Sequence, residues 1–238
     1  MPLAWPSILV PSSENWNPNK GASRGGGRGL TNQEQVVVGP SGYNTATLTI
    51  PCMTRARVLA MRALLAGFDG RAGSVFVGPF EVTRAPWFVD PDTGGKITYG
   101  QGAKDAALDP AWATNPDTSS RLDFQVGAAA AMNATSITIQ RNRGGFLEPG
   151  MMFSIGNRLH LITALTTADP VDPDTLQAGA GAVGIAFRPW LRADYPVGTP
   201  IEFGRPLGTM GLATDDTGAM ELQLSRLGTV TLDLVEKF

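Results

Sequence analysis

The segment 45–70, TATLTIPCMTRARVLAMRALLAGFDG, passes from a strand pattern directly into a helix pattern. In residues 45–50, apolar and polar side chains alternate, and this period of two predicts a strand with one face toward solvent. In residues 51–70 the apolar side chains recur at the spacing of one helix face, which predicts a single amphipathic helix packed on a sheet. The apolar face consists of Val58, Met61, Leu64, Leu65 and Phe68.

The ends and the outer face of this helix can also be predicted. Thr54 precedes the helix and is a favourable N-cap, and Gly67 or Gly70 can end it in a left-handed turn. Arginines occupy the side away from the apolar face, where they meet solvent or a partner; they are Arg55, Arg57 and Arg62.

Outside this segment the sequence favours strands. The chain has 29 Gly and 18 Pro in 238 residues, and they recur at short intervals, which favours short strands joined by turns over further helices. We expect the last two strands to form a hairpin around Gly228. The expected strands are 34–39, 45–50, 74–80, 121–126, 135–140, 151–156, 159–165, 182–190, 199–204, 219–227 and 229–238.

Three segments are rich in turn residues and are predicted to be loops. Residues 17–33 are rich in Gly and Arg without apolar periodicity, so we expect them to be mobile in an isolated monomer. Residues 90–120 are long and irregular, and residues 166–184 join two predicted strands. Long ordered loops usually have a packing or functional role.

The composition restricts the class of protein. The hydrophobic fraction is 42%, so a chain of this length can bury one large core or two small ones. Charged residues make up only 17%, below the usual quarter or so, which suits a surface that is buried against neighbours. The net charge of −2 provides no global basic field for holding nucleic acid.

The single cysteine and the N-terminal residues indicate assembly in a reducing cytosol. Cys52 excludes an intrachain disulfide and a cysteine-based zinc site, and we expect it to be a small buried residue. Residues 1–16 lack the basic start and long apolar run of a secretory signal. No window approaches the roughly 20 apolar residues of a membrane span, so we expect no membrane insertion.

The only histidine, His160, does not indicate catalysis. It lies in a predicted strand, with Leu159 and Leu161 on the opposite face. A Ser-His-Asp arrangement would have to use it, yet no G-x-S-x-G motif precedes it. We therefore expect a surface histidine or a cross-strand pair.

Clusters of carboxylates do not form a recognisable metal or catalytic site. Asp90 and Asp92 have the first spacing of a calcium loop, but Gln101 stands where the bidentate Glu is required. Aspartates in 90–95, 169–174 and 215–216 are better explained by Asx turns. We expect no metal and no other cofactor.

A pair of carboxylates for glycoside hydrolysis finds no support in the sequence. Glu148 and Glu202 could serve that chemistry only if they were held at about 5–10 Å, and no pattern places them so. The sequence therefore predicts that the protein is not an enzyme.

The Gly/Arg segment 23–29, SRGGGRG, has two interpretations. It lacks the Lys-Ser/Thr of a phosphate-binding loop, and it is short for a nucleic-acid-binding RGG segment. A flexible assembly loop explains it better, with Arg24 and Arg28 contacting acidic groups on neighbours.

Aromatic side chains concentrate in the middle of the chain. Trp87, Tyr99 and Trp112 belong to this group, and core packing or interface anchoring is the simpler explanation. Exposed aromatic faces with nearby Asp and Asn also bind sugars, so a host-glycan site is the alternative.

The order of these patterns resembles a known family. The relevant segments are 43–80, 144–165 and 184–206, with the motif positions Leu147–Ile155, Pro189–Arg192 and Val197–Pro200. A strand, Pro, helix, Gly-rich turn and apolar strand, followed by these motifs, resembles the distal tail protein family of long-tailed, non-contractile bacteriophages and gene transfer agents. The similarity covers residues 35–80 and 135–205.

The resemblance implies a two-domain, mainly β fold. Residues 1–84 and 203–238 would form a tail-tube-like β-sandwich with one α-helix, and residues 85–202 an inserted outer β-domain, a small OB-like barrel or sandwich. Six copies of the first domain would form a ring. The arginines expected to contact neighbours are Arg24, Arg28, Arg55, Arg57 and Arg62.

The resemblance also implies a structural role at the virion tail tip after assembly in the host cytoplasm. The hexameric ring would join the tail-tube protein to the tail hub or receptor-binding apparatus. Tape-measure protein and genome DNA would pass through its central channel without specific binding. The alternative function is a carbohydrate-binding host-adhesion module of a phage tail tip.

Overall fold

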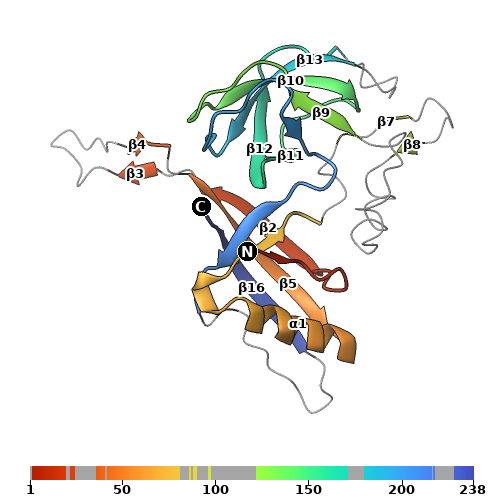
Figure 1. The fold of residues 1–238 in the computed structure, drawn as a ribbon, viewed down its shortest axis with the longest axis vertical. Helices are drawn as coiled ribbons and strands as arrows, with labels where there is room; N and C mark the ends of the chain where they lie inside the picture. The colour runs from red at the N-terminus through yellow and green to blue at the C-terminus, as the bar shows by residue number, and fades with distance from the viewer. Residues whose placement is uncertain are drawn as a thin grey trace.

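The computed structural model describes most of the chain, and within that part the protein is mainly β. Two six-stranded sheets and one α-helix account for most of the regular structure (Figure 1), which confirms the expected fold class of a β-sandwich with one helix plus a small barrel. The described residues are 2–19, 22–24, 36–40, 42–80, 86, 88–89, 96–97, 122–170, 180–215, 217 and 228–238.

The first sheet joins the beginning and the end of the described chain. Its order is β1-β6-β15-β16-β5-β2, and every neighbouring pair is antiparallel except β1–β6. The alternation in β5 places Ala46, Leu48 and Ile50 in the core, as predicted. The strands are β1 (Leu3–Ala4), β2 (Ser13–Asn19), β5 (Tyr43–Cys52), β6 (Val75–Val77), β15 (Gly208–Leu212) and β16 (Gly228–Glu236).

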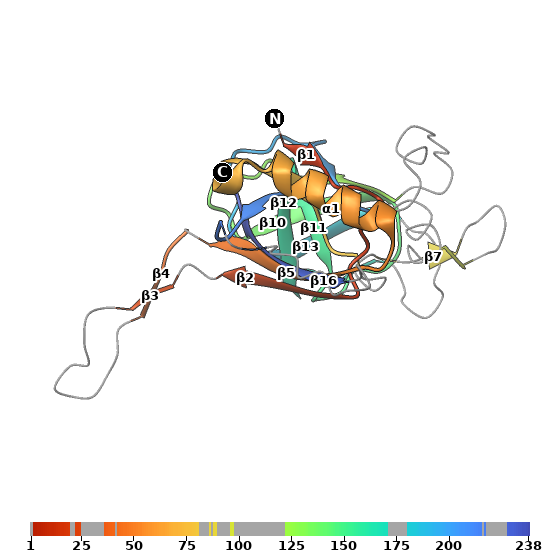
Figure 2. The ribbon, with the colours of Figure 1, turned by 90° about the horizontal axis from the view of Figure 1, so that it is seen from below.

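Helix α1 (Arg55–Gly67) covers one face of this sheet (Figures 1 and 2). The Thr54 side chain caps it by accepting a hydrogen bond from the Arg57 N–H at 3.3 Å, as predicted. Met61 and Phe68 are fully buried in the core. Gly67 is the last residue of the helix, but the left-handed residues are Asp69 and Gly70, with φ angles of 48° and 64°. A short 3₁₀ turn, η1 (Gly70–Ala72), follows.

The second sheet closes almost completely into a barrel. Its order is β11-β12-β13-β10-β9-β14, all antiparallel. The two outer strands meet through Ser154 and Glu202, whose backbone N–H groups each donate to the other's carbonyl at 2.9 Å. The strands are β9 (Asp123–Val126), β10 (Ser136–Arg143), β11 (Met152–Ile155), β12 (Arg158–Leu165), β13 (Gly181–Arg188) and β14 (Pro200–Ile201).

Each sheet has its own hydrophobic core. The first core draws on residues 5–77 and 210–234, and the second on residues 124–203. The predicted domain boundaries at 84/85 and 202/203 stay a prediction, because residues 81–85 lie outside the described part of the chain. Phe203, next to the second boundary, packs in the core of the barrel.

The barrel is inserted between two paired strands of the first sheet. Val77 at the end of β6 and Gly208 at the start of β15 are direct register partners, so the chain leaves and re-enters the sheet at one place. The segment that leaves the sheet and the segment that returns to it nearly touch there, since a Cβ added at Gly78 would lie 1.7 Å from the carbonyl oxygen of Pro206. A residue larger than glycine therefore does not fit at this neck.

Two short ladders lie outside the two sheets. One pairs β3 (Ala22–Arg24) with β4 (Val36–Val38), and it projects away from both sheets (Figures 1 and 2). The other pairs β7 (Phe88–Val89) with β8 (Lys96–Ile97). We call the β3–β4 ladder, residues 22–24 and 36–38, the arm.

Some loop predictions were wrong in part. Residues 17–19 end β2 and residues 22–24 form β3, although 17–33 was expected to be irregular. Within 90–120, residues 96–97 form a strand. The predicted strand 219–227, and with it the hairpin around Gly228, lies outside the described residues. No helix in the described ranges is long and apolar enough to cross a membrane.

Candidate functional site at the junction of the two sheets

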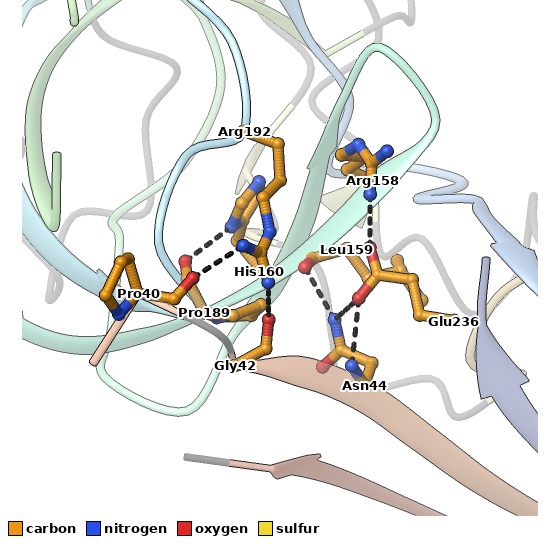
Figure 3. Close-up of polar contacts among 9 residues, drawn as sticks. All are labelled: Pro40, Gly42, Asn44, Arg158, Leu159, His160, Pro189, Arg192 and Glu236. Atoms are coloured by element: carbon orange, nitrogen blue, oxygen red, sulfur yellow. Dashed lines mark hydrogen bonds and ion pairs between the residues drawn. The ribbon is translucent and has the colours of Figure 1, made fainter. Parts of the chain in front are cut away.

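A buried polar cluster joins the first sheet to the barrel (Figure 3). Asn44, near the start of β5, is 1% exposed. Its side-chain Nδ2 donates to the carbonyl oxygen of Leu159 in β12 at 2.7 Å, and also to Glu236 Oε2 at 3.2 Å. Its backbone N–H donates to the same Glu236 oxygen at 2.9 Å. One asparagine therefore ties two strands of the first sheet to a strand of the barrel.

Glu236, at the end of β16, carries the negative charge of this cluster. It is 5% exposed, and its Oε1 accepts a hydrogen bond from Arg158 Nη1 of β12 at 3.4 Å. Burial raises the pKa of the Glu236 carboxyl, and the hydrogen bonds from Asn44 and the charge of Arg158 oppose that rise. A second polar link thus crosses from the first sheet to the barrel.

Arg192 of the barrel holds the segment that precedes β5. Its Nη1 donates to the carbonyl oxygen of Pro40 at 2.5 Å, and its Nη2 donates to the carbonyl oxygen of Gly42 (Figure 3). The ring of Phe238 lies beside the same guanidinium, with Cζ 4.7 Å from the ring centroid, and beside that of Arg158 at 4.8 Å. The two arginines and Phe238 therefore border the junction on one side.

His160 is part of the barrel core rather than of a catalytic site. It is 1% exposed, so the surface alternative was wrong, whereas the cross-strand alternative is confirmed by its pairing with Phe153. Its Nδ1 lies 2.9 Å from the carbonyl oxygen of Pro189, which can only accept, so Nδ1 carries the proton. The ring also contacts Phe187, and burial lowers the pKa of His160 to about 4. The imidazole is therefore neutral near pH 7.

Among the residues predicted to contact partners, the three whose side chains the structure describes lie on α1 and outside this junction. Arg55 and Arg62 are exposed on α1, as expected for partner or solvent contacts, and Arg57 donates to the Pro51 carbonyl at 3.3 Å. In Figure 1, α1 lies at the end of the molecule opposite the barrel. Arg24 belongs to β3, but its side chain lies outside the described part, as do the residues Arg28, Trp87, Tyr99 and Trp112.

The carboxylates singled out from the sequence have structural partners where they are described. Asp169 accepts from Arg141 Nη1 and Nη2 at 2.9 and 2.6 Å and from the Leu147 N–H at 2.9 Å, with both charged side chains fully buried. Asp169 therefore forms part of a buried ion pair, and its Asx-turn interpretation stays a prediction because residues 171–174 lie outside the described part of the chain. Asp215 accepts from the Arg71 N–H at 3.0 Å. Asp90, Asp92 and Gln101 lie outside the described residues.

Glu148, Glu202 and Cys52, which the sequence singled out, all lie in the part of the chain that the structure describes. No three His, Cys, Asp or Glu side chains gather there to hold a metal. Glu148 and Glu202 are both exposed, and Glu202 Oε1 accepts from the Arg205 N–H at 2.8 Å. Cys52 is buried, as predicted, and burial raises the pKa of its thiol.

The described contacts of the junction are mechanical connections between the two sheets. They fix the barrel against the first sheet through an asparagine, a buried carboxylate and two arginines, and sequence analysis missed all four. Asn44 and Glu236 are far apart in the chain, so no local spacing could have revealed their contact. No known protein family matches the sequence, and a search of curated proteins finds no significant match.

Proposed function

We propose that this protein forms the distal tail ring of a long-tailed, non-contractile phage-like particle. The observation that carries the proposal is an asymmetry between the two sheets. The barrel closes on itself through Ser154 and Glu202, whereas the first sheet ends in β2 and extends into the arm. Of the two six-stranded sheets in the described part of the chain, the first therefore offers an outer strand whose backbone groups another copy of the chain can complete.

The open edge of β2 supports assembly by sheet extension. β2 pairs with β5 on one side, and no strand in the described ranges pairs with its other side. An exposed edge presents unpaired N–H and C=O groups that recruit another chain. Closure of identical copies into a ring removes such edges and is a common form of symmetric assembly.

The arm also supports assembly. Its two strands are three residues each and project away from both six-stranded sheets (Figures 1 and 2). An isolated two-stranded ladder is marginal in water. Contacts with a neighbouring subunit would supply the missing stability, and the Gly/Arg segment 23–29 would lie at that contact.

The proposed ring has six copies and a structural task. It joins the tail-tube protein to the tail hub or receptor-binding apparatus at the virion tail tip, after assembly in the host cytoplasm. Its channel passes tape-measure protein and genome DNA without binding them specifically. A neutral to acidic channel suits this passage, and the net charge of −2 agrees with it. No catalytic step and no cofactor belong to this function.

The test is the mass of the purified protein alone and with its tail-tube partner. Native mass spectrometry is expected to show six copies, or incorporation onto tubes, and protease cleavage within 17–33 is expected to be fast in the monomer and slow in the assembly. A protein that stays monomeric with the tube partner, and is cleaved equally in all samples, would overturn the proposal. Glycan binding that disappears when Trp87 or Trp112 is replaced would instead support the host-adhesion alternative.

A further inference from the structure

The arm leaves the first sheet through a connection of unequal lengths. The β2–β5 ladder ends at the pair Asn19–Tyr43, and the arm begins at the pair Ala22–Val38. The connection is residues 20–21 on one strand and the longer 39–42 on the other. Extra residues on one strand interrupt a ladder and bend it. Strand pairing alone therefore does not fix the direction of the arm.

Arg192 binds this connection from the barrel. Its guanidinium donates to the carbonyl oxygens of Pro40 and Gly42, both on the longer strand (Figure 3). A planar guanidinium holds two acceptors in a fixed geometry, which a single ammonium group cannot do. The two bonds therefore restrain the orientation of the connection as well as its position.

The backbone next to Arg192 is itself firmly held. The side chain of Leu191 is fully buried in the barrel core. The Leu191 N–H donates to the Ala134 carbonyl at 3.0 Å, and its carbonyl accepts from the Asn133 N–H at 2.8 Å. The ring of Phe238 lies beside the guanidinium. Arg192 is therefore a rigid extension of the barrel.

We propose that Arg192 is a positioning residue that sets the direction in which the arm leaves the first sheet. Asn44 lies two residues after Gly42, the end of the connection, and its side chain donates to the Leu159 carbonyl of the barrel, so the barrel holds the connection and the start of β5 together. The barrel and the arm then move as one unit. The inference rests on the proposed function only where it assigns the arm a role in assembly. The effect of Arg192 on the direction of the arm does not depend on a ring.

The experiment measures the direction of the arm by electron paramagnetic resonance in the full chain. Spin labels are placed at Ser23→Cys in the arm and Thr231→Cys on the exposed side of β16, and Cys52 is buried and does not compete for label. The unsubstituted protein is expected to give one narrow distance distribution. Arg192→Ala is expected to shift or broaden it. Arg192→Lys is expected to restore it in part, because an ammonium group can still donate to the carbonyls but lacks the rigid planar geometry of the guanidinium.

A matched control separates arm direction from general loosening. Arg188→Ala removes another arginine of the barrel, whose Nη1 donates to the Phe187 carbonyl and does not touch the connection. It is expected to leave the distribution unchanged. A second label pair at Ser136 and Thr231 reports the barrel against the first sheet, and it is expected to stay unchanged in Arg192→Ala because the Asn44 and Glu236 links remain.

Each outcome decides the proposal. An Arg192→Ala distribution identical to that of the unsubstituted protein would overturn it. If circular dichroism shows that Arg192→Ala does not fold, the same comparison is made with Arg192→Lys. A distance distribution of Arg192→Lys identical to that of the unsubstituted protein would then overturn the proposal. Native mass spectrometry of the same samples tests the ring separately. An altered arm in a protein that never assembles supports the positioning role and overturns the proposed function.

Discussion

The barrel and the first sheet solve the problem of unpaired strand edges in different ways. The barrel closes through Ser154 and Glu202 and buries an Arg141–Asp169 ion pair. The first sheet keeps β2 as an outer strand and depends on α1 to cover one face of its core. A closed unit can fold as a rigid attachment, whereas an open one is suited to joining other chains. This difference is the basis of our proposal that the first sheet is the part that assembles.

The largest expected loss of stability comes from breaking the buried ion pair of the barrel. Asp169→Ala removes the carboxylate that accepts from both terminal nitrogens of buried Arg141, and the free energy of unfolding should fall by about 3–5 kcal/mol. Urea denaturation measures it. The double variant Arg141→Met with Asp169→Leu should lose much less, because it removes both charges. Asp123→Ala, on an exposed carboxylate of β9, is the control, and an equal loss there would contradict the importance of the buried pair.

The next largest effect is a dependence of the free energy of unfolding on pH, caused by a histidine in the barrel core. The pKa of His160 is lowered from 6.5 to about 4 in the folded protein, so the unfolded chain takes up a proton first as the pH falls. The contribution of neutral His160 to stability is therefore complete above pH 6.5. It is lost between pH 6.5 and 4, by about 3 kcal/mol in total.

The comparison with His160→Gln isolates this contribution. Glu236, whose pKa is raised, acts in the opposite direction, but it is present in both proteins and cancels in the difference. Urea denaturation across this pH range should show that the free energy of unfolding of His160→Gln falls less steeply, as the pH is lowered, than that of the unsubstituted protein. Parallel curves for the two proteins would show that the histidine does not carry the effect.

A smaller effect tests the open edge directly. Asn15→Lys places a charge on the exposed side of β2, and edge lysines oppose strand addition. Assembly should weaken about tenfold, equivalent to about 1.4 kcal/mol, without loss of monomer stability. Sedimentation at several concentrations measures it. The control is Thr163→Lys on β12 of the closed barrel, and equal weakening by both variants would indicate a general charge effect.

The smallest effect concerns the helix that covers the first sheet. Thr54→Ala removes the N-cap of α1 and should cost about 1 kcal/mol. Hydrogen exchange should rise in α1 and the first sheet and stay unchanged in the barrel. Thr199→Ala, which removes a hydroxyl bonded to the Pro196 carbonyl in the barrel, is the control and should have the reverse pattern.

Periodicity predicted the elements whose side chains form a regular apolar face. The alternation in β5 and the Thr54 cap of α1 were both correct because each depends on neighbouring residues alone. Strand β2, with the sequence SENWNPN, was missed since it is an outer strand rich in Asn with a Pro. Strand β15, GTMGL, was missed because two of its five residues are glycine.

The junction could not be predicted from local patterns. Asn44 and Glu236 meet because the pairing of β5 with β16 runs up to the pair Thr45–Val235, directly beside them. Arg192 reaches Pro40 only because the barrel folds back on the sheet. Asn44 lies in a strand and Arg192 ends the motif Pro189–Arg192, but neither position indicates which residue the side chain will contact. Such contacts form between residues that only the tertiary structure brings together, so no local sequence motif predicts them.

The direct pairing of Val77 with Gly208 makes the whole barrel, topologically, the loop of one β-hairpin. A two-residue turn could replace residues 78–207 without changing any register in the first sheet, since two-residue turns are the commonest hairpin connections. The barrel is thus a removable appendage, and related chains could exchange it for another fold at the same neck while retaining the sheet beneath it.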